Sequence, residues 1–242
     1  MLAFHGDVAT KDKYLTRVRM HRAADNLIQG TGWEGGKGCA VGCTLEAYEH
    51  HRYETELGIP QVLARLEDRI FECLPNAEAQ KWPSRFLAAI PVGADLSKVW
   101  PQFAVWMLRQ CMGFTSNEEV QGILDHVAHL YESDVPYSDA QWHNARAEAW
   151  SIRTAYATAA NAANATAVAA DAAAAYAAAY AAAYAAANAY AAYADAYADA
   201  AAYAADDASA AASAARKQFW RAASKQLLLL LSQAPVAIHG AA

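Results

Sequence analysis

The glycine-rich segment 35–44 holds the residues of this chain that are best suited to chemistry. Its sequence, Gly-Gly-Lys-Gly-Cys-Ala-Val-Gly-Cys-Thr, sets a lysine and two cysteines among four glycines. Glycine allows close approach to the backbone, and the N-terminus of a following helix would add unpaired N–H groups for an anion. The segment is not a P-loop, because Gly38 rather than Ser or Thr follows Lys37. We expect either a tight turn that packs the cysteines beneath the next helix or a site for a small anionic ligand.

A nucleotide-like molecule would suit such a site. The residues expected to contact it are Lys37, Gly38, Cys39, Cys43, Thr44, Trp33 and Arg22. Trp33 could stack on a base, as aromatic side chains do. Arg22 belongs with Arg17 and Arg19 to a basic helix expected over 11–28. These arginines offer an anion-binding surface or form a solvated helix face.

The two cysteines also permit metal or thiol chemistry. Cys39 and Cys43 could bind zinc together with His50 or His51, although the spacing of the cysteines is loose and no second pair occurs at suitable spacing. Cys43 could be a nucleophile, since a helix N-terminus lowers a thiol pKa. His50 is nearly two turns further along and is poorly placed as its base. We therefore favour a non-catalytic protein without a cofactor and keep a Cys- or metal-dependent enzyme as an alternative.

An alanine-rich tract over 154–215 dominates the second half of the chain. Alanine supplies 40 of its 62 residues, and the tract contains no Gly, Pro, Lys, Arg or Glu. Alanine has the highest helix propensity, so we expect long helices that fold back near 206–209, where Asp and Ser can form a turn or a cap. Six tyrosines fall on one half of such a helix: Tyr176, Tyr180, Tyr184, Tyr190, Tyr193 and Tyr197. This face, with few charges, predicts self-association or binding to a partner.

Hydrophobic residues before the tract repeat with a helical period, which predicts an all-α fold. Helices are expected over 45–57, with Thr44 as cap, and over 60–74, 76–90 and 117–132, the last opened by a Ser116–Glu119 capping box. Ser138 and Gln141 should cap the helix that enters the tract. We expect no strand pair. The predicted domains are a helical globule over 1–137 and, over 138–242, a long-helix region with a basic, Leu-rich terminal helix.

Charge and composition limit the function. The 242 residues carry 19 Lys and Arg against 25 Asp and Glu, a net charge of −6, which argues against general nucleic-acid binding. Alanine contributes little to membrane insertion, so we expect no membrane span in the tract. The N-terminus has no apolar signal segment, and four cysteines form no disulfide framework. A cytoplasmic protein is the expectation.

Two parts of the chain together resemble an uncharacterised family of phage and prophage proteins. The first runs from His5-Gly6-Asp7 through the Lys37–Thr44 motif to Gly58-Ile59-Pro60 and Leu66-Glu67-Asp68, and the second is the Ala- and aromatic-rich tail. The resemblance implies a phage accessory role. The family has no assigned catalytic residues, so it implies none here.

Three hypotheses follow. The leading one is a non-catalytic interaction protein of phage type that acts as a homo-oligomer or binds a partner through its Ala/Tyr helix. The second is a protein that sequesters a small nucleotide-like ligand and thereby counters host defence. The third is the small enzyme that uses Cys43 or a metal.

Overall fold

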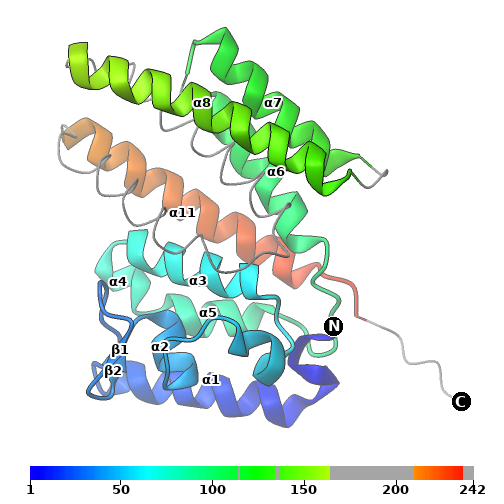
Figure 1. The fold of residues 1–242 in the computed structure, drawn as a ribbon. Coiled ribbons are helices and arrows are strands. Elements are labelled where there is room, and N and C mark those ends of the chain that lie inside the picture. Colours follow the sequence, from blue (N-terminus) through cyan, green and yellow to red (C-terminus); the bar gives the residue numbers. More distant parts are fainter. Residues whose placement is uncertain (114, 134–136, 164–209, 237–242) are drawn as a thin grey trace, which may run out of the picture. The chain divides into compact units, whose positions relative to one another are not determined.

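The computed structural model describes residues 1–113, 115–133, 137–163 and 210–236, and its fold is all-α, as predicted (Figure 1). The chain forms two compact units. Unit 1 consists of Met1–Trp100 together with Ala212–Ala242, and unit 2 of Pro101–Ala211. The sequence predicted a single boundary at 137 and assigned the terminal helix to the tail. The structure instead returns that helix to the N-terminal globule, so that unit 2 is an insertion in unit 1.

Unit 1 is a set of helices with one minimal hairpin. Its helices are α1 (Val8–Ala23), α2 (Ala40–Leu45), α3 (Gln61–Cys73), α4 (Asn76–Ala79), α5 (Trp82–Ala89) and α11 (Ala210–Ser232). Unit 1 also contains two short helical turns of other types, a 3₁₀ turn η1 (Ala3–Gly6) and a π-helical turn η2 (Tyr53–Leu57). The hairpin pairs β1 (Trp33–Glu34) with β2 (Lys37–Gly38). The core is built from large apolar side chains such as Trp82, Phe71 and Ile70, each with no exposed surface.

Polar side chains fix the ends of the unit 1 helices. Asp7 caps α1 by accepting hydrogen bonds from the backbone N–H groups of Ala9 and Thr10, both at 3.0 Å. Lys11 reaches from α1 to the end of α5, where its Nζ donates to the carbonyl oxygens of Ala88 at 2.9 Å and Ile90 at 2.6 Å. A lysine at a helix C-terminus satisfies carbonyl groups that lack partners within the helix. These bonds tie α1 to α5.

The N-terminal residues and the last described residues both meet the Ala94–Asp95 segment in unit 1. The backbone N–H of Ala3 donates to the carbonyl of Ala94 at 2.9 Å, and that of Asp95 donates to Pro235 at 2.8 Å. Val236 also forms an antiparallel bridge with Ala94. Three segments that are distant in sequence are thus joined by backbone hydrogen bonds. This explains why α11 belongs to unit 1.

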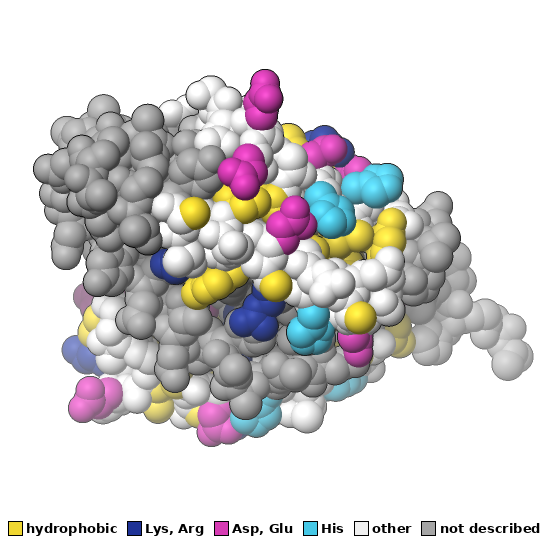
Figure 2. All heavy atoms as spheres, turned by 45° about the horizontal axis from the view of Figure 1, so that its top comes forward, with side chains coloured by type: hydrophobic (Ala, Val, Ile, Leu, Met, Phe, Trp, Pro, Cys, Tyr) yellow, Lys and Arg dark blue, Asp and Glu magenta, His cyan; other side chains and the backbone are white. Residues whose placement is uncertain are grey.

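Unit 2 contains most of α6 (Val99–Met112) with α7 (Glu118–Glu132) and α8 (Asp139–Ala163). Its core consists of Leu108, Val120, Ile123, Leu124, Val127, Ala128, Leu130, Trp142, Ala145, Ala149 and Ile152. Arg109 joins α6 to α7 through Glu132 at 3.0 Å and Asp125 at 3.5 Å. Figure 2 shows acidic and histidine side chains beside apolar and basic ones on the described part of one face of the molecule.

The expected caps of unit 2 are half confirmed. The backbone N–H of Ser138 donates to the Gln141 side chain at 2.9 Å, and the N–H of Gln141 donates back to the Ser138 hydroxyl at 3.4 Å. This is the predicted capping box. At the start of α7, however, Asn117 is the cap in place of Ser116, since its side chain accepts from the backbone N–H groups of Glu119 and Val120.

The predicted fold-back near 206–209, like most of the Ala/Tyr tract, lies outside the described residues. Within the described part of the chain, no helix combines the length and the apolar character needed to cross a membrane.

Candidate functional site

The glycine-rich loop is a hairpin that leads directly into a helix. Trp33 and Glu34 pair antiparallel with Gly38 and Lys37, and a two-residue turn joins them. Gly35 and Gly36 in that turn have φ values of +57° and +81°, which glycine adopts without a steric penalty. The expectation of no strand pair was therefore wrong at this place. Strands of two residues are too short to show an alternating pattern.

The helix after the loop begins earlier and ends earlier than predicted. Cys39 is the cap of α2, and Thr44 lies inside the helix, where its hydroxyl donates to the carbonyl of Ala40 at 2.8 Å. The helix ends at Leu45 because Glu46 takes a left-handed conformation with φ of +56°. The helix predicted over 45–57 with Thr44 as its cap is wrong. Only the π-helical turn η2 forms in its second half.

Two loop glycines are required by packing. A Cβ atom on Gly38 or Gly42 would collide with the carbonyl oxygen of Gly32. The backbone N–H of Cys39 also donates to this segment, to the carbonyl oxygens of Thr31 at 2.7 Å and Gly32 at 3.1 Å. The close backbone approach that glycine permits is thus used within the protein, which favours the tight-turn interpretation of the loop.

The two thiols of the loop are buried and form hydrogen bonds. Cys43 Sγ donates to the carbonyl oxygens of Asn26 and Gly38, both at 3.4 Å, and Cys39 Sγ accepts from the N–H of Gly42 at 3.4 Å. Burial raises the pKa of Cys43 to about 12, and burial also raises that of Cys39. A nucleophilic thiol needs a lowered pKa, so these environments work against thiolate chemistry.

The histidines of the zinc hypothesis have other partners. His50 Nε2 lies 3.3 Å from Asp68 Oδ2, and the exposed His51 pairs with Glu49 at 3.7 Å. Over the described residues, no group of three or more His, Cys, Asp or Glu side chains could hold a metal ion. The structure does not bring Cys39, Cys43, His50 and His51 together as a ligand set.

A buried acidic cluster on α3 was missed in the sequence analysis. Glu67 has no exposed surface and accepts from the Tyr53 hydroxyl at 2.6 Å. Its neighbour Asp68 accepts from the Tyr48 hydroxyl at 3.2 Å. Burial raises the pKa of Glu67 well above its usual range. A signal was available, since Glu67 lies four residues after Leu63 on the apolar face of its helix.

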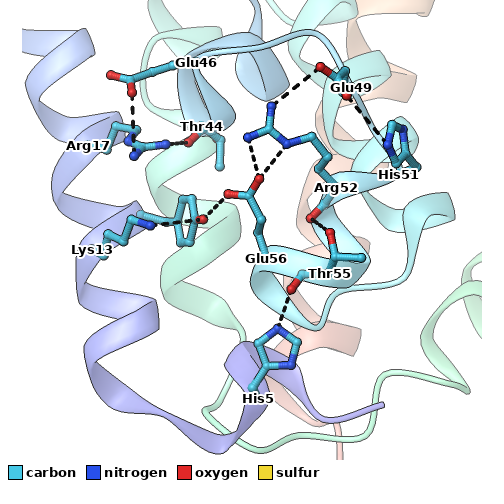
Figure 3. Close-up of polar contacts among 11 residues, drawn as sticks. His5, Lys13, Arg17, Thr44, Glu46, Glu49, His51, Arg52, Thr55 and Glu56 are labelled. Carbon is cyan, nitrogen blue, oxygen red and sulfur yellow. Dashed lines mark hydrogen bonds and ion pairs between the residues drawn. The ribbon is translucent and has the colours of Figure 1, made fainter.

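An open groove of about 360 Å³ runs along α1. It is lined by Lys13, Thr16, Arg17, Met20, His21, Ala24, Asn26 and Glu46. Figure 3 shows Lys13 and Arg17 on α1 facing acidic side chains of the segment that follows α2. Arg17 Nη1 donates to the carbonyl of Thr44 at 3.0 Å, and its Nη2 lies 3.6 Å from Glu46. His21 Nε2 lies 3.5 Å from the same carboxylate.

A polar network flanks this groove (Figure 3). The Tyr14 hydroxyl donates to Glu56, which also accepts from Arg52 Nε at 2.6 Å. Burial, together with the hydrogen bond to Glu56, raises the pKa of Tyr14 to about 12. Lys13 Nζ is 3.5 Å from the Tyr14 oxygen and lies over the Tyr14 ring, 4.8 Å from its centroid. The network holds α1 against the turn η2.

The remaining predicted contacts are dispersed. Lys37 and Arg22 are exposed, while Trp33 is half-buried and meets His21 edge-on, with ring centroids 5.4 Å apart. The groove on α1 therefore gathers more ionic side chains than the glycine-rich loop does.

Comparisons with protein-family models, with curated proteins and with solved structures give no match to this chain.

Proposed function

We propose that this chain is a cytoplasmic, non-catalytic α-helical interaction protein of phage type that associates with itself through its Ala/Tyr tract. The observation that carries the proposal is the use of the loop groups as structural partners. The thiols of Cys39 and Cys43 are buried and hydrogen-bonded, and both have a raised pKa. The groups best suited to catalysis thus stabilise unit 1.

The tract supplies the interacting surface in this proposal. Its 62 residues are mostly alanine and tyrosine with few charges, and apolar surfaces of that size are seldom left in water. The chain is anchored immediately after the tract, because α11 buries Leu227 and Leu231 and pairs Arg221 with Glu78 at 2.6 Å in unit 1. Unit 1 can therefore hold the downstream end of an associating segment.

Sedimentation velocity of three versions of the full chain tests the proposal. The wild-type chain should sediment as an oligomer of the 26.0 kDa protomer. The variant Tyr176→Lys/Tyr180→Lys/Tyr184→Lys places charge on the predicted tyrosine face and should become monomeric. The control, Tyr156→Lys/Tyr203→Lys, changes two tyrosines that a helical period of about 3.6 residues places on the opposite side, and it should remain an oligomer. A monomeric wild-type chain, or equal association of the two variants, would refute self-association through this face.

A second candidate function is the binding of a small anionic ligand. The observation that favours it is the α1 groove, whose size suits a small molecule and whose wall carries Lys13, Arg17 and His21. Four of the predicted ligand contacts in the loop are buried, namely Gly38, Cys39, Cys43 and Thr44. This candidate function therefore puts the ligand in the α1 groove instead of the loop.

A further inference from the structure

We propose that the α1 groove binds a phosphomonoester group at Lys13, Arg17 and His21, a site called the seat below. We further propose that the Glu46 carboxylate occupies the seat when no ligand is bound. The proposal deepens the second candidate function and depends on it. Lys13, Arg17 and His21 follow one another at four-residue intervals, so they lie on one face of α1. Each step on such a face is about 6 Å, which brings neighbouring side chains of this set within reach of one polyatomic anion.

Glu46 lies loosely against two of these groups. Its two carboxylate oxygens face Arg17 Nη2 at 3.6 Å and His21 Nε2 at 3.5 Å. Charge-assisted hydrogen bonds are shorter, about 2.7–2.9 Å. The Glu46 side chain is 50% exposed, and exposed ion pairs contribute little to stability. An external anion with better hydrogen-bond geometry can therefore displace it.

Arg17 is oriented without the help of Glu46. Its Nη1 donates to the backbone carbonyl of Thr44 at 3.0 Å, and its guanidinium lies 5.2 Å from the centroid of the Tyr14 ring. These two contacts hold the guanidinium in place when the Glu46 carboxylate moves away. Preorganised donors bind a ligand at lower entropic cost, so Arg17 is suited to receive an anion.

The residue at position 46 is unusual for its backbone. Glu46 ends α2 in the left-handed conformation that helices commonly give to glycine or asparagine. A glutamate here carries the conformational cost and adds a carboxylate beside Arg17 and His21. The seat is thus filled with a charge of the same sign as the ligand that we propose.

A phosphomonoester fits the groove better than a carboxylate does. The two oxygens of Glu46 face only Arg17 and His21, whereas a phosphate has a third terminal oxygen available for Lys13, which lines the same groove. A dianion also matches a wall that carries the two cationic side chains of Lys13 and Arg17. Met20, with 66% of its surface exposed, and Ala24 line the same groove and offer an apolar contact to the body of the ligand.

Isothermal titration calorimetry of the full chain with phenyl phosphate, adenosine 5′-monophosphate and inorganic phosphate tests the proposal. The wild-type chain should bind the two monoesters saturably and more tightly than inorganic phosphate, because Met20 contacts the ester group. Adenosine without its phosphate should not bind. Equal affinity for inorganic phosphate and the two esters would refute the contact between Met20 and the ester group. Free phosphate would then be the ligand of the seat.

Variants separate the seat from the groove. Glu46→Gln should bind phenyl phosphate about fivefold more tightly, since it removes a competing charge. Arg17→Gln should bind it at least about tenfold more weakly and Lys13→Gln about fivefold more weakly. Arg19→Gln removes the same charge from an exposed position of α1 that does not line the groove, and it should stay within about twofold of wild type.

The outcomes distinguish two failures. If neither the wild-type chain nor Glu46→Gln binds any of the three anions, ligand binding in the groove is refuted. If the wild-type chain binds but Glu46→Gln binds equally or more weakly, the groove is a binding site and the role of Glu46 is refuted. Thermal melting of each variant shows whether a loss of affinity comes from unfolding, and Lys13→Gln tests the seat even if Arg17→Gln unfolds.

Discussion

Replacement of Glu72 by glutamine should make unit 1 more stable at neutral pH and leave its stability unchanged in acid. Glu72 lies at the end of α3, where its Oε2 accepts from the N–H of Gly30 at 2.7 Å. Burial raises its pKa from 4.5 to about 7, and the nearby Asp68 adds to the increase. The folded state therefore binds this proton more tightly than the unfolded state does.

The sign of the pH dependence follows from this raised pKa. Below pH 4.5 the carboxyl is protonated in both states and contributes no difference. As pH rises towards 7, the unfolded state ionises freely while the folded state resists ionisation, so the free energy of unfolding falls. The full shift corresponds to about 3 kcal/mol. We expect about 1–2 kcal/mol, because the Glu72 side chain is partly exposed and solvent screens its charge.

Urea denaturation followed by circular dichroism measures this difference. Glu72→Gln stays neutral and can still accept from Gly30, so its advantage over wild type should grow between pH 4.5 and 7 and then level off. Glu78→Gln is the matched control. Arg221 lowers the Glu78 pKa, so this variant should be less stable than wild type above pH 4.5, and the difference should vanish in acid. A pH-independent difference for Glu72→Gln would refute the buried carboxyl as its cause.

Two further substitutions test the packing. Gly42→Ala should destabilise unit 1 by about 3 kcal/mol, seen as a lower urea midpoint, because the new Cβ collides with the Gly32 carbonyl; a midpoint equal to wild type would mean that the loop has room. Gly122→Ala, within α7, should instead stabilise unit 2 by about 1 kcal/mol, because beyond the adjoining backbone of its own helix no atom lies within 4 Å of the new Cβ, and alanine favours helix. A lower thermal midpoint for Gly122→Ala would contradict that expectation.

Helices with strong local signals could be predicted from the sequence. Pro60 precedes α3, whose apolar spacing identified the helix, and the Ser138–Gln141 pair marked the start of α8. In both cases the deciding interactions lie within a few residues of each other. The confirmed all-α fold follows from the same local periodicity.

Features set by distant contacts could not be predicted in this way. Nothing near Leu45 in the sequence shows that α2 ends there, because the left-handed Glu46 faces Arg17 and His21 of α1. The return of α11 to unit 1 depends on contacts with Ala94 and Glu78, residues far earlier in the chain. The sequence therefore indicated arginines on the first helix as a candidate anion surface but not the groove that Arg17 helps to form.

Most of the Ala/Tyr tract lies within a long insertion between the two parts of unit 1, and this position affects how strongly the fold constrains its sequence. Unit 1 closes through pairs such as Glu78 and Arg221, which are 143 residues apart. The entropy of closing so long a loop changes slowly with length, by only about 0.6 kcal/mol for each doubling. The stability of unit 1 therefore places little constraint on the length or composition of the inserted tract. The proposed self-association assigns the six tyrosines from Tyr176 to Tyr197 to contacts between copies of the chain, and the tyrosine-to-lysine variants measure those contacts directly.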